Sequence, residues 1–101
     1  LFVSIDFCCR GKESTYKMVV GRSKSIKGPY LDDTGRAMYR GGYKSIKSSS
    51  QEWVAAGHCG VHHIDGKDFL VAHAYSSQTG NSQLIIREIV WDVDGWPDIK
   101  L

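Results

Sequence analysis

The chain has 101 residues, 42% of them hydrophobic and 24% charged, a composition typical of globular proteins that excludes a disordered or collagenous chain. Its 13 basic and 11 acidic residues leave a formal charge of +2 and are scattered, so no nucleic-acid partner is expected. No apolar run approaches the roughly 20 residues that cross a bilayer, so no membrane partner is expected either.

The first half of the chain reads as a hairpin followed by a long connection. Residues 1–7 and 15–22 are rich in Val, Phe, Ile and Tyr and flank a loop centred on Gly11, which indicates two antiparallel strands. Residues 23–42 contain several turn-forming pairs and little periodicity, so a surface connection is expected there. A short edge strand is expected after it, at 43–47.

Three more β-rich runs occupy the second half. After a polar loop at 48–52, they cover 60–64, 68–75 and 82–91. Asp65-Gly66, between the first two, is typical of a tight hairpin turn. Within the last two runs, residues 69–74 and 84–90 are apolar nearly throughout, so both faces of those strands are expected to be covered by neighbours.

The fold class predicted from this pattern is all-β, because no window carries the apolar spacing of an amphipathic helix. Two groups of antiparallel strands joined by a long connection suggest two successive propeller blades. The first residues read as a strand already in progress, with no initiator Met and no turn residue before it. This start predicts that the chain is a fragment of a longer protein.

The three cysteines do not form a recognisable disulfide framework. Cys8 and Cys9 are adjacent, which leaves Cys59 as the distant cysteine. Vicinal cysteines rarely bridge each other because their geometry is strained, so a bond between Cys8 and Cys9 is not expected.

A series of short motifs runs along the whole chain. They are Leu1-Phe2-Val3-Ser4, Cys8-Cys9-Arg10-Gly11, Ser14-Thr15-Tyr16-Lys17, Gly21-Arg22-Ser23-Lys24-Ser25-Ile26, Gly28-Pro29-Tyr30, Gly57-His58, His73-Ala74-Tyr75 and the segment 91–97. In this order and spacing they resemble the closing portion of the endo-α-1,5-L-arabinanases of glycoside hydrolase family 43. The block at 21–30 is shared by many members of that family, whereas the two motifs at 8–17 point to the arabinanase group.

The resemblance implies that residues 1–101 are the C-terminal part of a single five-bladed β-propeller. Residues 1–47 would then finish blade four and residues 53–101 would form blade five. The implied activity is hydrolysis of α-1,5-linked L-arabinan with inversion, which uses a carboxylate base and a carboxylic acid on opposite sides of the sugar.

By the family layout, these two carboxyl groups and a third Asp that tunes the acid lie before Leu1, in the same polypeptide or in a separate chain made by nicking. The acidic residues present here fall at predicted strand ends and turns, where capping or solvation is their ordinary role. No catalytic residue is therefore predicted in this chain.

The resemblance places His58 on the central channel beside a bound calcium ion. Calcium prefers oxygen ligands, so the ion would be solvated, with His58 as its main protein contact and waters completing the shell. The alternative is a histidine satisfied within the blade core. Ala55-Ala56 replaces the Gly-Pro that often precedes Gly-His in the family, which affects the expected shape of the loop.

Zinc is not expected, although four histidines are present. By strand alternation His62 shares a face with His58, while His63 points the other way, and the cysteines lack the paired spacing of structural zinc sites. His73 is interpreted as a packed strand residue.

Cys8, Cys9 and Arg10 are the predicted substrate-binding residues. In the resemblance they follow a strand that pairs with the strand of the general acid, and loops at the open face of such a fold carry recognition. The alternative is that both cysteines are small, buried packing residues. Trp53 is placed in an exposed loop as a further sugar contact, and Trp91 and Trp96 in a terminal hairpin.

The runner-up activities are those of an exo-arabinanase, an arabinofuranosidase or a β-xylosidase of the same family. The alternative outside enzymes is a non-catalytic carbohydrate-binding β module. A secreted or extracellular location is expected because polymeric arabinan cannot enter a cell intact, and the periplasm is the alternative. The partners that the resemblance implies are arabinan or arabino-oligosaccharide and the N-terminal portion of the same protein.

Overall fold

The computed structural model describes all 101 residues, and it confirms the all-β fold class. Two single 3-10 turns, η1 (Gly11–Glu13) and η2 (Met38–Arg40), interrupt the strands, and no helix is long and apolar enough to cross a bilayer. The eight strands are β1 (Phe2–Ile5), β2 (Lys17–Val20), β3 (Lys44–Ser45), β4 (Trp53–Ile64), β5 (Lys67–Ser76), β6 (Ser82–Glu88), β7 (Val90–Trp91) and β8 (Pro97–Asp98).

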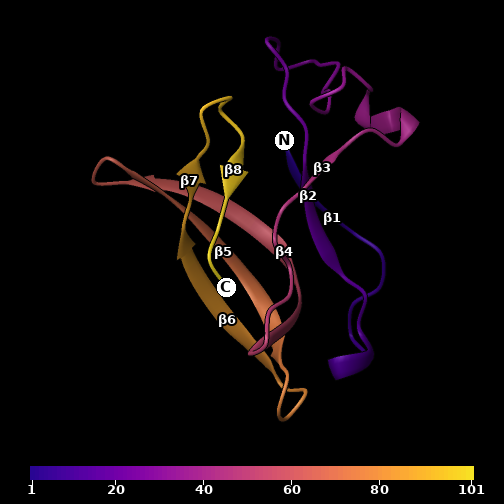
Figure 1. Ribbon diagram of the computed structural model, residues 1–101, viewed down its shortest axis with the longest axis vertical. Helices are drawn as coiled ribbons and strands as arrows, with labels where there is room; N and C mark the ends of the chain where they lie inside the picture. The colour runs from indigo at the N-terminus through magenta and orange to yellow at the C-terminus, as the bar shows by residue number, and fades with distance from the viewer.

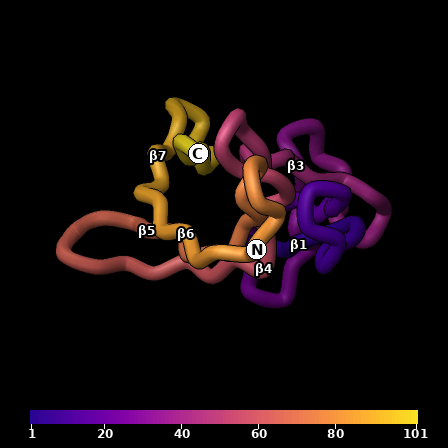
Figure 2. Tube along the Cα trace, turned by 90° about the horizontal axis from the view of Figure 1, so that it is seen from below, coloured from indigo at the N-terminus to yellow at the C-terminus, as the bar shows by residue number.

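The strands form two antiparallel three-stranded sheets and a small hairpin. The first sheet has the order β1-β2-β3, the second has the order β4-β5-β6, and β7 pairs with β8. β4 runs alongside β1 and β2, so the two sheets meet at this strand (Figure 1). In Figure 2 the first sheet lies to one side of β4 and β5 to β7 lie to the other. The assignment of these sheets to blades four and five stays a prediction.

β4 is longer than the sequence indicates. It starts at Trp53 and not at Gly60, although residues 55–57 are Ala-Ala-Gly, which have low intrinsic strand preference. Val54 and Gly57 pair with β5, and two register shifts interrupt the pairing, between Val54 and Gly57 and between Gly57 and Gly60. In the first irregularity Ala55 has a φ of 52°, and the N–H groups of Ala55 and Ala56 donate to Ser49 Oγ and to the Ser48 carbonyl instead of to β5. Contacts with neighbouring segments therefore outweigh local propensity here.

Trp53 is not in an exposed loop, so its prediction as a sugar contact is wrong. It is the first residue of β4, pairs with Ser76, and is only 8% exposed. The indole packs in the hydrophobic core, where burial of a large aromatic surface contributes more than solvent contact would.

The core lies where the two sheets and the terminal hairpin meet. Its twelve buried residues are Met18, Val20, Ile46, Trp53, Ala56, Leu70, Ala72, Ala74, Ile85, Ile89, Trp96 and Ile99. Alternate residues of β5 and β6 face it, as expected for strands with one buried face. On the other face of β6, Leu84 and Ile86 are 70% and 54% exposed. Residues 1–101 thus cover only one face of this sheet, and the expectation of two covered faces fails within the chain.

The terminal hairpin is joined to the first sheet through Trp96. This indole is 3% exposed, the Arg22 guanidinium lies 4.3 Å from its ring centroid, and Lys44 Nζ lies 5.7 Å from it. Arg22 also donates to the backbone carbonyl of Asp94. These contacts fix the end of the chain against segments more than fifty residues earlier.

A polar cluster holds the far end of the β4–β5 hairpin. His63 Nδ1 donates to Asp68 Oδ1 at 2.7 Å, and Trp91 Nε1 donates to Asp68 Oδ2 at 2.7 Å. The hydrogen bonds from His63 and Trp91 hold the pKa of Asp68 below its usual value of 3.8, because they favour the ionised carboxylate.

We expect the Asp68 carboxylate to stabilise the fold at neutral pH and to lose that contribution in acid. Its pKa is lower in the folded than in the unfolded chain, so the stabilisation is fully present above the unfolded value and disappears as the pH falls through the folded value. Thermal unfolding of the full-length protein should show Asp68→Asn less stable than wild type at neutral pH, with the difference shrinking in acid. Asp65→Asn, in the neighbouring turn, is the control, and a pH-independent loss in Asp68→Asn would contradict this account.

Candidate functional site

Cys8 and Cys9 form a disulfide, with an S–S distance of 2.07 Å. The expectation that these two cysteines do not bridge is therefore wrong. The backbone makes this possible by turning at Cys9, whose φ of 71° lies in the left-handed region. Cys8 is half-buried and Cys9 is exposed, so the alternative of two small buried packing residues is also wrong.

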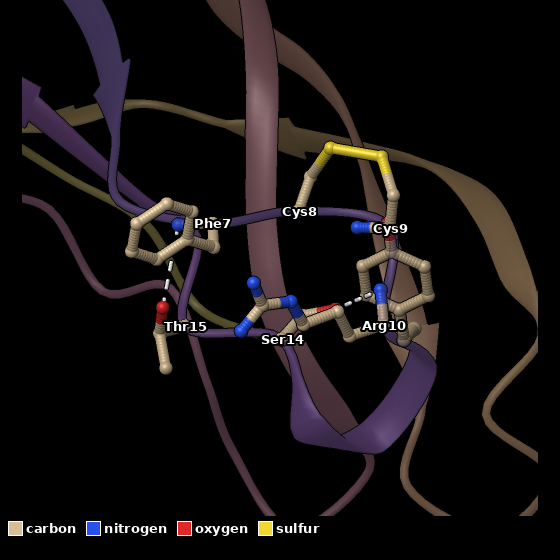
Figure 3. Close-up of a disulfide and its surroundings, with 7 residues drawn as sticks. Phe7, Cys8, Cys9, Arg10, Ser14 and Thr15 are labelled. Atoms are coloured by element: carbon tan, nitrogen blue, oxygen red, sulfur yellow. Dashed lines mark hydrogen bonds between the residues drawn. A yellow bond between two sulfur atoms is a disulfide. The ribbon is translucent and has the colours of Figure 1, made fainter.

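Two hydrogen bonds within the loop that carries the disulfide hold its shape, one at its base and one directly after Cys9. Thr15 N donates to the Phe7 carbonyl at 2.9 Å, and Arg10 N donates to the Ser14 hydroxyl at 3.0 Å. Figure 3 shows the two sulfurs projecting from one side of the loop, with Arg10 and Ser14 on the other. The Arg10 guanidinium lies 4.9 Å from the Phe7 ring centroid, a cation–π contact that keeps the exposed charge next to the loop.

Tyr75 joins this loop to the second sheet. Its hydroxyl accepts a hydrogen bond from the Cys9 backbone N–H at 2.7 Å, across 66 positions in the sequence. The Tyr75 side chain extends from the central strand β5 and is only 6% exposed. The disulfide loop is thus attached to a rigid part of the fold.

A row of aromatic side chains continues from Tyr75 to His58. The ring centroids of Tyr75 and His73 are 6.0 Å apart, and those of His73 and His58 are 5.9 Å apart. Tyr16 flanks the row, with its ring 6.2 Å from that of His73, and packs directly over Gly57. His73 Nδ1 is buried and has no hydrogen-bond partner, a costly arrangement unless a ligand or water bonds to it.

His58 owes its position to the second register shift in β4. Its φ is 53°, uncommon for a residue other than glycine, and its backbone N–H donates to Ser4 Oγ at 2.8 Å. Such bulges redirect side chains and are frequent beside active sites. Because the bulge interrupts strand alternation, the simple face argument linking His58 and His62 does not apply. The imidazole of His58 is exposed.

The donor set of residues 1–101 does not form a complete metal site. No group of three His, Cys, Asp or Glu side chains is arranged around one point, and calcium would need several oxygen ligands. The exposed His58 imidazole, next to the unpartnered Nδ1 of His73, fits one protein ligand of a solvated ion whose other donors lie outside this chain.

Cys59 follows His58 but lacks the properties of a nucleophile. Its thiol is free, and burial raises its pKa above the usual 9.0, opposed by a hydrogen bond from Ser4. A half-buried thiol whose pKa is raised in this way stays protonated at neutral pH.

The structure connects two of the predicted site regions, the Cys8–Cys9 loop and His58, through Tyr75 and His73. Tyr75 is not among the predicted site residues, and His73 is predicted to be a packed strand residue. A signal was present, because residues two apart in a strand share a face, which places both aromatic side chains of His73-Ala74-Tyr75 on one side of the sheet. The missing information was which segment covers that side.

Comparison with known proteins gives a consistent result. The family model described as glycosyl hydrolases family 43 matches residues 1–97. The chain is 47% identical over 100 residues to an extracellular exo-α-(1→5)-L-arabinofuranosidase of Cellvibrio japonicus and 44% identical over 98 residues to an extracellular endo-α-(1→5)-L-arabinanase of Bacillus subtilis. These alignments cover 98% and 96% of this chain and 29% of each relative.

The solved structures agree. The α-L-arabinanase of Cellvibrio cellulosa complexed with arabinohexaose is 45% identical with a TM-score of 0.92, over 98% of this chain and 32% of that one. An exo-1,5-α-L-arabinanase from a bovine ruminal metagenomic library is 40% identical with a TM-score of 0.93, over 99% of this chain and 34% of that one. Such arabinanases are five-bladed β-propellers, of which this chain represents a part. With a family match over residues 1–97 and 47% identity along almost its whole length, the chain belongs to the glycosyl hydrolases of family 43.

Proposed function

We propose that residues 1–101 are the C-terminal part of an extracellular enzyme that hydrolyses α-1,5-linked L-arabinan with inversion. The observation that carries this proposal is the 47% and 44% identity, over nearly the whole chain, to two extracellular enzymes whose names specify that linkage. The catalytic carboxylates are supplied by the part of the protein outside this chain. Because one of these relatives is exo-acting and the other endo-acting, the proposal concerns the linkage and not the mode of cleavage.

Within that enzyme, we assign the Cys8–Cys9 disulfide and Arg10 to substrate contact. Cys9 and Arg10 are both exposed on a loop that the rigid β5 anchors. A disulfide offers an apolar surface for the C–H face of a furanose ring, and a guanidinium offers several hydrogen-bond donors to its hydroxyls. The pair therefore suits a sugar, which presents both kinds of surface.

The exposed apolar face of β6 supports the proposal that this chain is part of a larger propeller. Leu84 and Ile86 lie two positions apart on that face and are 70% and 54% exposed. Adjacent large apolar side chains open to solvent mark a surface that another part of a protein covers. We assign this face to contact with the N-terminal portion, within one polypeptide or between nicked chains.

The test is an assay of the full-length protein on linear α-1,5-arabinan. We expect new reducing ends, and proton NMR during the first turnovers should detect the β-anomer, because inversion of an α-linkage gives that anomer first. Chromatography of the products separates the modes, since an endo-acting enzyme releases a range of oligosaccharides and an exo-acting one a single short product. Hydrolysis of β-xylosides without arabinan hydrolysis, or sugar binding without hydrolysis, would overturn the proposal.

We further propose that His58 is the protein ligand of a calcium ion whose other ligands are waters and groups outside this chain. Bound calcium would supply a fixed positive charge at the channel. A ligand that binds only the folded state raises its stability. Calcium is therefore expected to raise the melting temperature of the full-length wild type after chelation, and His58→Ala should abolish that shift. His62→Ala, an exposed histidine on the same strand, is the control, and an unchanged calcium shift in His58→Ala would exclude this role.

A further inference from the structure

We propose that Tyr75 is a positioning residue whose hydroxyl holds the Cys8–Cys9 disulfide where the substrate meets it. Tyr75 would not touch the sugar itself but would act through the loop. This inference rests on the proposed function, specifically on substrate contact by the disulfide loop.

The first support is the way in which the Cys9 backbone is held. Its φ of 71° is unfavourable for a residue with a side chain, so the surrounding structure must maintain this conformation. The Cys9 N–H donates to Tyr75 Oη at 2.7 Å, whereas the Thr15–Phe7 and Arg10–Ser14 hydrogen bonds only join residues of the loop to one another. The phenol thus bonds the loop at the disulfide itself.

The second support is the rigidity of the side chain that makes this bond. Tyr75 lies on the central strand of its sheet, paired with Val54 of β4 and Ser82 of β6. Its ring is 6% exposed and meets His73 edge to face at 6.0 Å. A donor or acceptor fixed by packing can hold a neighbouring group in a productive position, as functional sites require.

The third support is that the same ring contacts both parts of the site. Tyr75 bonds Cys9 on one side and touches His73 on the other, and His73 stacks on His58 at 5.9 Å. A second contact between the loop and this sheet is the close packing of Gly11 against Gly80, with a Cβ on Gly11 lying 3.2 Å from the Gly80 carbonyl oxygen. That contact lies beyond the disulfide, at the β5–β6 turn, so it cannot replace the hydrogen bond at Cys9.

The experiment is Tyr75→Phe in the full-length protein, with Tyr39→Phe as the matched control because Tyr39 is 77% exposed. Two readouts are needed: hydrogen exchange of the peptide containing Cys9, and kcat and KM on linear arabino-oligosaccharides. We expect amide exchange at Cys9 to accelerate. We also expect KM to rise about fivefold, which corresponds to the loss of one neutral hydrogen bond. The value of kcat should change less than about twofold, because the lost bond affects substrate binding and the transition state equally.

A variant that lacks the disulfide, Cys8→Ser with Cys9→Ser, allows a double-mutant cycle with Tyr75→Phe. If Tyr75 acts through the disulfide, Tyr75→Phe should raise KM much less in the variant without the disulfide than in the wild type. Hydrogen exchange can be read even if the protein hydrolyses no arabinan, which separates failure of the proposed function from failure of this inference.

Three outcomes would overturn the inference. Unchanged exchange at Cys9 would mean that the hydroxyl does not hold the loop. Faster exchange with unchanged KM would mean that the disulfide does not contact the substrate, so that Tyr75 has no positioning role. A fall in kcat at constant KM would indicate that Tyr75 acts in the chemical step.

Discussion

Trp96→Ala is expected to destabilise the full-length protein by about 3–5 kcal/mol, the usual cost of removing a buried tryptophan. Trp96 is 3% exposed in the core, so truncation leaves a cavity that the short β7–β8 hairpin cannot fill. The substitution also removes the ring over which Arg22 and Lys44 lie at 4.3 and 5.7 Å. Both cations then lose a favourable contact, and the hydrogen bond from Arg22 to the Asp94 carbonyl remains as the contact of the hairpin with Arg22.

Chemical denaturation of the full-length protein measures this effect. Val93→Ala is the matched control on the same hairpin, because Val93 is 99% exposed, and its change should stay within about 0.5 kcal/mol. Trp96→Phe retains an aromatic ring in the core and should lose less than Trp96→Ala. If Trp96→Ala and Val93→Ala were equally stable, the hairpin would not be part of the cooperative core.

The parts of the fold that follow local rules were predictable. The turn at Asp65-Gly66 is one example, since both residues have positive φ values, 51° and 77°, as the tight hairpin of this dipeptide requires. β5 and the terminal hairpin around Asp94-Gly95 also lie where the sequence indicates. In these segments, strand preference and turn chemistry agree with the final pairing.

The failures share a physical cause, which is that contacts distant in sequence decide the local structure. Ala56 has little strand preference, yet it is fully buried in the core and belongs to β4. Trp53 follows a polar loop, which suggested exposure, but pairing with Ser76 turns it inward. Trp53 is held by its partner in β5, and Ala56 by a hydrogen bond from its N–H to the Ser48 carbonyl and by the core around it, so in both cases the information lies outside the strand itself.

The candidate site was predictable only in part, for the same reason. The resemblance selected Cys8, Cys9, Arg10 and His58, and the structure connects the loop to His58 through side chains of β5. The general rule that adjacent cysteines rarely bridge holds for common backbone conformations, and for this reason the disulfide was not predicted. Cys9 has a left-handed backbone conformation, and its N–H donates a hydrogen bond to the Tyr75 hydroxyl. A rule about pairs of residues cannot include a third residue 66 positions away.

Gly57→Ala is the second substitution expected to have a large effect, about 3 kcal/mol, at the upper end for overpacking. A Cβ on Gly57 would lie 2.2 Å from Tyr16 Cδ1, so the ring must move. Tyr16 packs against His73, which in turn stacks on His58. The displacement should therefore reach the proposed calcium ligand and reduce hydrolysis of arabinan as well as stability.

Gly60→Ala is the matched control, because Gly60 lies on the same strand and the nearest atom to its Cβ position is His62 Nε2 at 3.4 Å, the end of a movable side chain. Its change should remain below about 1 kcal/mol. Removing the obstacle should rescue Gly57→Ala, so in a Tyr16→Ala background we expect the second substitution to cost far less than it does alone. If Gly57→Ala lowered the stability equally in the wild-type and the Tyr16→Ala backgrounds, the close approach of Tyr16 to the backbone would not be the reason for glycine at this position. The position of His58 would then not depend on this packing.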